Sequence, residues 1–144
     1  MGQPLVELVD IRKRYGTGEA AFEALRGVSF SIDEGEFVAI MGPSGSGKTT
    51  LLNCISTIDR PSAGRILING SDITTMSKNK LSAFRRDELG FIFQDSNLLD
   101  TLTGMENIAL ALTIKGARPA SITSRIEDIA RTLNVTESLK QYPS

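Results

Sequence analysis

Alternating hydrophobic and polar residues in the first half of the chain predict a layer of short β-strands. Residues 4–11 and 25–33 alternate well enough to be strands, the second through Val28, Phe30 and Ile32. Residues 61–70 read as a turn followed by a strand, which an Asn-Gly turn pair closes. We therefore expect a small β layer in this part of the molecule.

Two other apolar runs predict strands of a second kind. Residues 36–41, EFVAIM, show little alternation, as in a strand that is covered on both faces. Residues 90–94, GFIFQ, predict another strand, which ends at Gln94. We expect the β layer to lie around the strand at residues 36–41.

Helical spacing of apolar residues predicts two helices in the middle of the chain. Residues 77–90 predict a short surface helix with Ser77 as N-cap, Leu81 and Phe84 as its apolar edge, and Gly90 as its stop. The helix that precedes it, over residues 48–58, has an expected apolar face of Leu51, Leu52, Ile55 and Ile58.

The last third of the chain predicts two further helices. Thr103 and Glu106 have the spacing of a capping box, which begins a helix that stops near Gly116. The final long segment predicts an amphipathic helix. Its apolar positions are Ile122, Ile126, Ile129 and Leu133.

A glycine-rich loop lies between the strand at 36–41 and the first helix. Its glycines allow successive backbone N–H groups to turn toward one point, which suits an anion, and the helix N-terminus also favours negative charge. Gly42, Gly47, Lys48 and Thr49 satisfy G-x-x-x-x-G-K-[ST], in which the lysine reaches β- and γ-phosphates and the hydroxyl binds Mg²⁺. A glycine turn that binds nothing is the alternative, but the flanking strand and helix favour a phosphate-binding loop.

Composition limits the classes of function. The chain has 144 residues, 40% hydrophobic and 23% charged, enough for one globular domain with a core. Its formal charge of -1 gives no basic field that would argue for a nucleic-acid partner. The apolar runs are too short to span a membrane, so we expect a cytosolic or peripheral protein. The single cysteine, Cys54, is expected to be a packed thiol.

Two long segments together resemble a known family. Residues 42–73, GPSGSGKTTLLNCISTIDRPSAGRILINGSDI, and residues 89–108, LGFIFQDSNLLDTLTGMENI, are similar to the nucleotide-binding domain of ATP-binding cassette (ABC) transporters. The resemblance extends from about Leu5 to the last residue. It implies an α/β P-loop NTPase fold, with a RecA-like core and an N-terminal antiparallel β layer. Residues 1–96 would be the ATP-binding core, with an incomplete sheet, and residues 97–144 the beginning of a helical subdomain.

The resemblance also implies roles for individual residues toward ATP and Mg²⁺. Tyr15 would stack on adenine, although an ordinary strand-end tyrosine is the alternative; a base on an aromatic face is worth about 1–3 kcal/mol. Gln94 would contact Mg²⁺ or the attacking water, and Lys48 would act with it in catalysis. Thr49 would supply the other Mg²⁺ ligand. The implied nucleotide-binding residues are Tyr15, Gly42, Ser44, Gly45, Ser46, Gly47, Lys48, Thr49 and Thr50.

The family further implies protein partners. A membrane permease would dock near Asp95 to Leu102, and a second nucleotide-binding domain would pair with the first when ATP binds. The protein would then lie on the inner face of the cell membrane. The segment over residues 72–103 most resembles the branch that exports lipoproteins, macrolides or antimicrobial peptides. Arg85 and Arg86 could contact anionic lipid or the permease, but a solvated basic helix face is the preferred interpretation.

Several parts that the family uses for hydrolysis are missing from the sequence. The chain has no LSGGQ-type signature, no apolar strand that ends in Asp-Glu, and no histidine. We therefore expect a fold truncated at the C-terminus before the signature, with a gap in its central sheet that exposes strand edges. The chain is either part of a transporter ATPase or a binding module that holds Mg-ATP without hydrolysing it. GTPases and small-molecule kinases are a weaker third class, because a guanine-reading motif is absent.

Overall fold

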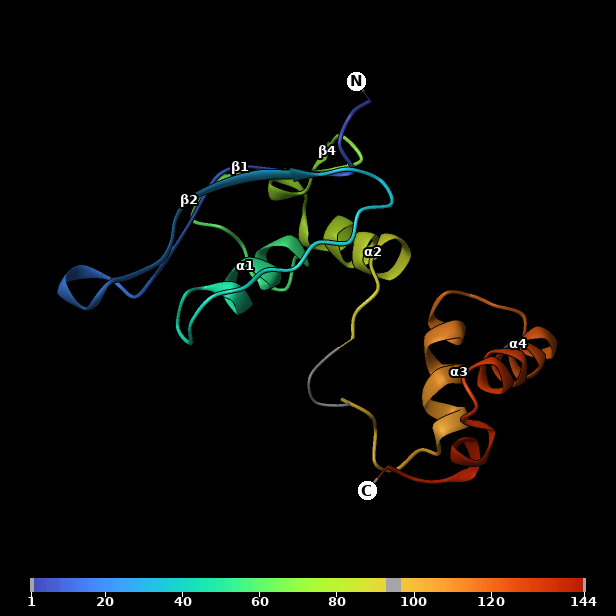
Figure 1. Ribbon diagram of the computed structural model, residues 1–144. Coiled ribbons are helices and arrows are strands. Elements are labelled where there is room, and N and C mark those ends of the chain that lie inside the picture. Colours follow the sequence, from blue (N-terminus) through green and yellow to red (C-terminus); the bar gives the residue numbers. More distant parts are fainter. Residues whose placement is uncertain (1, 93–96, 144) are drawn as a thin grey trace. The chain divides into compact units, whose positions relative to one another are not determined.

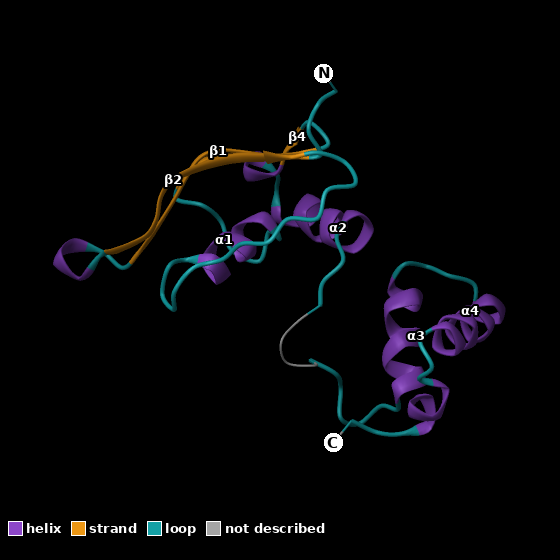
Figure 2. Cartoon of the chain, in the orientation of Figure 1, coloured by secondary structure: helices purple, strands orange, loops and turns teal. Residues whose placement is uncertain are grey.

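The computed structural model describes residues 2–92 and 97–143, which form two compact units, Met1–Leu89 and Gly90–Ser144 (Figure 1). Within the described residues, strands occur only in the first unit, as Figure 2 shows. The second unit is built from helices and loops.

The first unit contains a four-stranded antiparallel sheet with the order β2-β1-β3-β4. The strands are β1 (Val6–Tyr15), β2 (Phe22–Ile32), β3 (Ala63–Ile68) and β4 (Ser71–Asp72), and a 3-10 turn, η1 (Gly18–Ala20), lies between β1 and β2. Asn69 and Gly70 both have positive φ, 48° and 71°, and form the turn between β3 and β4. The predicted β layer and its closing turn are thus confirmed.

A β-bulge in β1 determines which side chains face the core. Leu8 and Ile11 are both fully buried although they are three residues apart, because Asp10 (φ 48°) is an extra residue in the strand. The bulge therefore places Ile11 and the alternate residues after it on the same face as Leu8. The bulge fits only against glycine on β3: Gly64 has φ +89°, and a Cβ there would lie 2.6 Å from the Val9 carbonyl oxygen.

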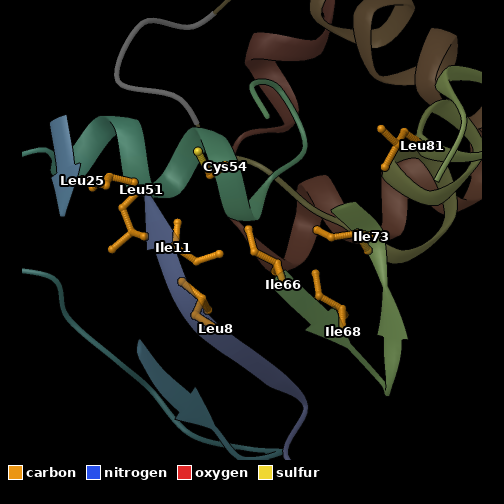
Figure 3. Packing of buried hydrophobic residues seen from close by; sticks show 9 residues of the cluster. All are labelled: Leu8, Ile11, Leu25, Leu51, Cys54, Ile66, Ile68, Ile73 and Leu81. Atoms are coloured by element: carbon orange, nitrogen blue, oxygen red, sulfur yellow. The ribbon is translucent and has the colours of Figure 1, made fainter. Parts of the chain in front are cut away.

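Two helices complete the core of the first unit. Figure 3 shows α1 (Lys48–Ile55) directing Leu51 and Cys54 toward side chains of β1 and β3. Side chains from η2 (Ile73–Thr75) and α2 (Lys78–Glu88) extend this core, and each buried aliphatic side chain stabilises it by about 1.5–3 kcal/mol. Burial also raises the pKa of Cys54, in agreement with a packed thiol. The core residues are Leu8, Ile11, Leu25, Leu51, Cys54, Ile66, Ile68, Ile73 and Leu81.

Both strands predicted from unalternating apolar runs are absent from the described residues. Residues 36–41 form no strand, and Phe37 is 98% exposed. Residues 90–92 likewise form no strand, and Ile92 is fully exposed. These predictions were wrong because a strand needs a hydrogen-bonded neighbour, and no described segment pairs with either run. The end of the second run, with Gln94, lies outside the described residues.

The predicted apolar face of the first helix needs correction. The helix α1 ends at Ile55, so Ile58 lies beyond it and is half exposed, as is Leu52. The chain turns at Thr57, which has φ 61°, and Arg85 donates hydrogen bonds to its carbonyl and hydroxyl oxygens at 3.0 and 3.1 Å. The stop of the helix is therefore held by a contact from α2 that the sequence pattern does not reveal.

The helix α2 forms where it was predicted. The hydroxyl of Ser77 accepts a hydrogen bond from the Lys80 N–H at 3.4 Å, and Leu81 is buried. Arg85 is bound to Thr57, and Arg86 forms an ion pair with Asp87. Neither arginine is an unengaged cation on this face.

The second unit consists of α3 (Gly104–Ile114), α4 (Pro119–Thr132) and η3 (Thr136–Lys140). The predicted capping box is confirmed: the Thr103 hydroxyl accepts from the Glu106 N–H at 3.3 Å, and the Glu106 carboxylate accepts from the Thr103 N–H at 2.8 Å. Gly116 follows the end of α3 with φ 77°. The core of this unit contains Ile122, Ile126, Ala130 and Leu139.

The apolar face of α4 differs from the prediction. Ile129 and Leu133 are more than half exposed, whereas Ala130 is buried. Steps of four residues turn slightly more than one helical turn, so the buried stripe moves from Ile122 toward Ala130 and away from Ile129. Leu133 lies beyond the last helical residue.

Candidate functional site

The glycine-rich loop turns directly into the N-terminus of α1, as predicted. Gly47 is the N-cap of the helix with φ 89°, and a Cβ at this position would lie 2.7 Å from the Ala24 carbonyl oxygen. Glycine therefore lets the loop pack closely against β2. Gly45 has a similar φ of 79° but no neighbour near its Cβ position, so this part of the loop faces open space.

Lys48 connects the two ends of the loop. Its ammonium donates hydrogen bonds to the carbonyl oxygens of Gly42 at 2.8 Å and Pro43 at 2.7 Å, and it reaches Ser46 Oγ at 3.4 Å. A lysine ammonium has three donors and no acceptor, so these three oxygens can accept from all of its donors. The same charge is available to phosphate oxygens at the mouth of the loop.

An open cavity of about 310 Å³ lies between the loop and the sheet. Lys48 is the single charged residue among its described lining residues, so the cavity favours an anion. The hydroxyls of Thr49 and Thr50 are oxygen ligands of the kind that Mg²⁺ prefers, so the lining fits a metal–phosphate group. The lining residues are Tyr15, Phe22, Ala24, Ser44, Gly45, Gly47, Lys48, Thr49 and Thr50.

Most of the predicted site residues thus meet at one cavity. Gly42 does not line this cavity. Its carbonyl oxygen accepts a hydrogen bond from Lys48, which does line it. Ser46 lines an adjoining cavity of about 380 Å³ beside β2. Gln94 lies outside the described residues.

One end of the cavity is aromatic. Tyr15 and Phe22 are cross-strand partners at the end of the β1–β2 hairpin, and both line the cavity. Both rings are partly exposed, Tyr15 at 41% and Phe22 at 56%. Sequence reasoning missed Phe22, because its place opposite Tyr15 depends on register, and β1 and β2 are offset by several irregularities.

The Tyr15 hydroxyl is hydrogen-bonded to a residue that does not line the cavity. It donates a hydrogen bond to Asp59 Oδ2 at 2.8 Å. This bond, together with burial, raises the pKa of the phenol above its ordinary value of 10.0. The phenol is therefore protonated and able to donate at neutral pH.

Together, the fold and the site define the class of protein. A glycine-rich loop that matches G-x-x-x-x-G-K-[ST] and opens directly into a helix is the phosphate-binding loop of P-loop NTPases. Comparison with known proteins gives the family: the family described as "ABC transporter" matches residues 25–144. The chain belongs to the ABC transporter family.

Curated relatives agree with this assignment. The chain is 52% identical over 137 residues to the ABC transporter ATP-binding protein YxdL of Bacillus subtilis, covering 95% of the chain and 53% of that protein. It is 45% identical over 140 residues to the bacitracin export ATP-binding protein BceA of Halalkalibacterium halodurans, covering 97% and 55%. It is 43% identical over 142 residues to the macrolide export ATP-binding/permease protein MacB of Marinobacter nauticus, covering 99% and 22%.

A solved structure supports the fold directly. The dimeric post-hydrolysis state of the ATP-binding cassette MJ0796, bound to ADP and Pi, is 36% identical with a TM-score of 0.87, covering 96% of this chain and 61% of that one. The predicted ABC cassette fold is thus confirmed. The chain spans about half the length of the first two of these curated relatives and 61% of that cassette. Over the described part of the chain, none of the helices has the length and apolar character needed to cross a membrane.

Proposed function

We propose that the chain is the ATP-binding part of an ABC transporter ATPase subunit that couples Mg-ATP binding and hydrolysis to transport by a membrane permease. The observation that carries this proposal is the single cavity in which a phosphate-type loop, a lysine and an aromatic end meet. The relatives named for bacitracin and macrolide export support an export system as the full assembly.

Within this proposal, each end of the cavity binds one part of the nucleotide. The backbone N–H groups of Gly45 to Thr50 surround the phosphates, with the Ser44 and Ser46 side chains at the loop. Lys48 leaves its loop carbonyls for β- and γ-phosphate oxygens, and Thr49 offers its hydroxyl to Mg²⁺. The ion, when bound, neutralises charge on the phosphates. The adenine stacks on Tyr15, with Phe22 beside it.

The remaining assignments concern the assembly. Gln94 acts near the γ-phosphate as a Mg²⁺ or water contact, and the permease docks near Asp95 to Leu102. A second nucleotide-binding domain completes the site when ATP binds. Residues 1–96 form the ATP-binding core and residues 97–144 begin the helical subdomain. We place the assembled protein on the inner face of the cell membrane.

One observation favours a second candidate function, in which the chain holds Mg-ATP without hydrolysing it. Among the described residues that line the cavity there is no carboxylate that could serve as a base for water. The two functions differ in turnover and not in binding. Phosphate release by the chain in its assembly with the permease and a second nucleotide-binding domain would support hydrolysis, whereas tight Mg-ATP binding without phosphate release in that assembly would support the second function.

The proposal is tested by titrating Mg-ATP into the chain and into Lys48→Ala by calorimetry. We expect Lys48→Ala to weaken binding by about 100-fold or more, because a charge-assisted phosphate contact is lost. Lys80→Ala is the matched control, because it removes the same charge from an exposed position on α2. Unchanged Mg-ATP affinity in Lys48→Ala would reject the assignment of the loop.

A further inference from the structure

Three side chains form a polar network at the base-binding end of the site. The Asp59 carboxylate accepts a hydrogen bond from Lys13 Nζ at 2.6 Å through Oδ1 and one from the Tyr15 hydroxyl at 2.8 Å through Oδ2. The Arg60 N–H also donates to Oδ1 at 2.7 Å, and its carbonyl accepts from Lys13 at 2.7 Å. Both carboxylate oxygens are therefore occupied.

The network is charged and partly shielded from water. The side chains of Lys13 and Asp59 are 11% and 30% exposed. Burial alone would raise the pKa of the Asp59 carboxyl, but hydrogen bonds from Lys13, Tyr15 and the Arg60 backbone outweigh burial and lower it. Asp59 is thus an anion at neutral pH, which makes it a strong acceptor for the phenol.

Asp59 links Tyr15 to the helix that begins at the phosphate loop. The Asp59 N–H donates to the Asn53 carbonyl oxygen of α1 at 3.0 Å, so the backbone of Asp59 is held to the C-terminal turn of that helix. The N-terminus of the same helix carries Lys48 and Thr49. The network therefore sets the position of the Tyr15 ring relative to the residues that face the phosphates.

Lys13 also distinguishes the two faces of the ring. Its Nζ lies over the Tyr15 ring at 4.8 Å from the centroid, on the same face of β1, where the bulge at Asp10 places both residues. A base cannot stack on the face that this cation covers. Tyr15 lines the cavity, so a base bound there would use the face that Lys13 does not cover.

We propose that Asp59 is a positioning residue for the base: it holds the Tyr15 ring, together with Lys13, at a fixed place relative to α1, so that the site prefers a nucleotide over a bare polyphosphate. This inference rests on the proposed function, because it assumes that phosphates bind at the loop. Asp59 itself does not contact the base. It acts through Tyr15.

The test compares two ligands in calorimetric titrations of the full chain: Mg-ATP, which carries a base, and Mg-tripolyphosphate, which does not. We expect Asp59→Asn and Tyr15→Phe each to weaken Mg-ATP binding by about 3- to 10-fold, the range of a lost hydrogen bond. Tripolyphosphate affinity should change less than about 2-fold. The double variant should be no weaker than the weaker single variant, because Tyr15→Phe removes and Asp59→Asn weakens the same bond between phenol and carboxylate. Glu34→Gln, an exposed carboxylate of equal charge in the same unit, should change neither affinity.

Other outcomes would overturn the inference in distinguishable ways. Equal losses for both ligands in Asp59→Asn would show a role in folding alone, and unchanged Mg-ATP affinity would show no role. If the unsubstituted chain binds tripolyphosphate as tightly as Mg-ATP, the inference fails and the phosphate loop stands. If the unsubstituted chain binds neither ligand, the proposed function is wrong, and the inference, which depends on it, is wrong as well. Should Asp59→Asn not fold, Tyr15→Phe alone decides, because it keeps the ring and removes the hydroxyl.

A spectroscopic readout tests the hydrogen bond itself. The chain has two tyrosines and no tryptophan, so Tyr142→Phe leaves Tyr15 as the only tyrosine chromophore. In that background, the alkaline absorbance change of the phenol should have its midpoint above the ordinary value of 10.0. Asp59→Asn should move the midpoint down. An unchanged midpoint would contradict the proposed network.

Discussion

The two segments that flank the phosphate-type loop both carry several apolar residues but have different structures. The segment after it forms α1, which buries Leu51 and Cys54 against the sheet. The segment before it, residues 36–41, forms no strand and leaves Phe37 and Met41 almost fully exposed. A helix makes its backbone hydrogen bonds within itself, whereas a strand depends on a neighbour. Local sequence therefore suffices for one flank and not for the other.

The largest expected effect tests the packed flank through two adjacent leucines. Leu51 is 6% exposed and Leu52 is 52% exposed on the same helix. We expect Leu51→Ala to lower the free energy of unfolding by about 2–5 kcal/mol, because it leaves a cavity in the core. Leu52→Ala should cost less than about 1 kcal/mol. Urea unfolding measures both values, and equal costs would contradict the assigned burial.

The second prediction concerns the bulge that brings Tyr15 to the cavity. Gly64→Ala should lower the free energy of unfolding by about 2–4 kcal/mol, because it adds both a positive-φ penalty and a clash with β1. Gly35→Ala is the control: Gly35 has a similar φ of +82° but open space around it, so it should cost only about 1 kcal/mol. If both variants lower the free energy of unfolding by the same amount, the close packing of Gly64 against the bulge in β1 would be contradicted.

The third prediction tests a local signal in the second unit, where a capping box begins α3. Hydrogen bonds from the Thr103 N–H and hydroxyl lower the pKa of Glu106 below its ordinary 4.5. The stabilisation that this carboxylate adds is therefore complete above that value, and it is lost as pH falls through the lowered pKa.

The measurement compares the unsubstituted chain with Glu106→Gln by thermal unfolding across acidic pH. The difference in stability should be largest near neutral pH and should shrink as Glu106 becomes protonated. Asp100→Asn, an exposed carboxylate outside the box, is the control for general charge effects. A difference that stays constant down to pH about 2, well below ordinary carboxyl values, would contradict the shifted pKa.

We expect the smallest effect on stability in residues 36–41, the exposed segment before the loop. Phe37→Ser should change the free energy of unfolding by less than about 0.5 kcal/mol, because the ring has almost no contacts to lose. It should, however, weaken self-association in sedimentation velocity experiments, since exposed apolar segments that lack strand partners favour association. A monodisperse chain that melts cooperatively above about 60 °C would contradict this view of the flank.

What the sequence predicts follows the same division between local and non-local information. The loop, the start of α1 and the capping box at Thr103 were predicted because each depends on residues close in sequence. The strand at residues 36–41 and the described part of the strand predicted at residues 90–94 do not form, because strand pairing depends on distant segments. The spacing of Leu8 and Ile11 breaks the alternation of β1 in the sequence. That the break is a bulge, which shifts Tyr15 to the face of Leu8, depends on the room that Gly64 leaves on β3.

The site residues divide in the same way. Lys48 and Thr49 belong to a contiguous pattern, so their meeting at the cavity could be predicted. Phe22 and Asp59 could not, because their places depend on strand register and on the turn after α1. Tyr15 was named by resemblance alone. Its hydrogen bond to Asp59 is what the structure adds.

The most direct test of the central claim is amide hydrogen exchange with and without Mg-ATP. If the nucleotide binds as proposed, we expect slower exchange at residues 45–50, whose N–H groups would face the phosphates, and at Tyr15, on which the base would stack. Lys48→Ala should show no such change under the same conditions. Binding of Mg-ATP without slower exchange at residues 45–50 would contradict the assignment of the nucleotide to this loop.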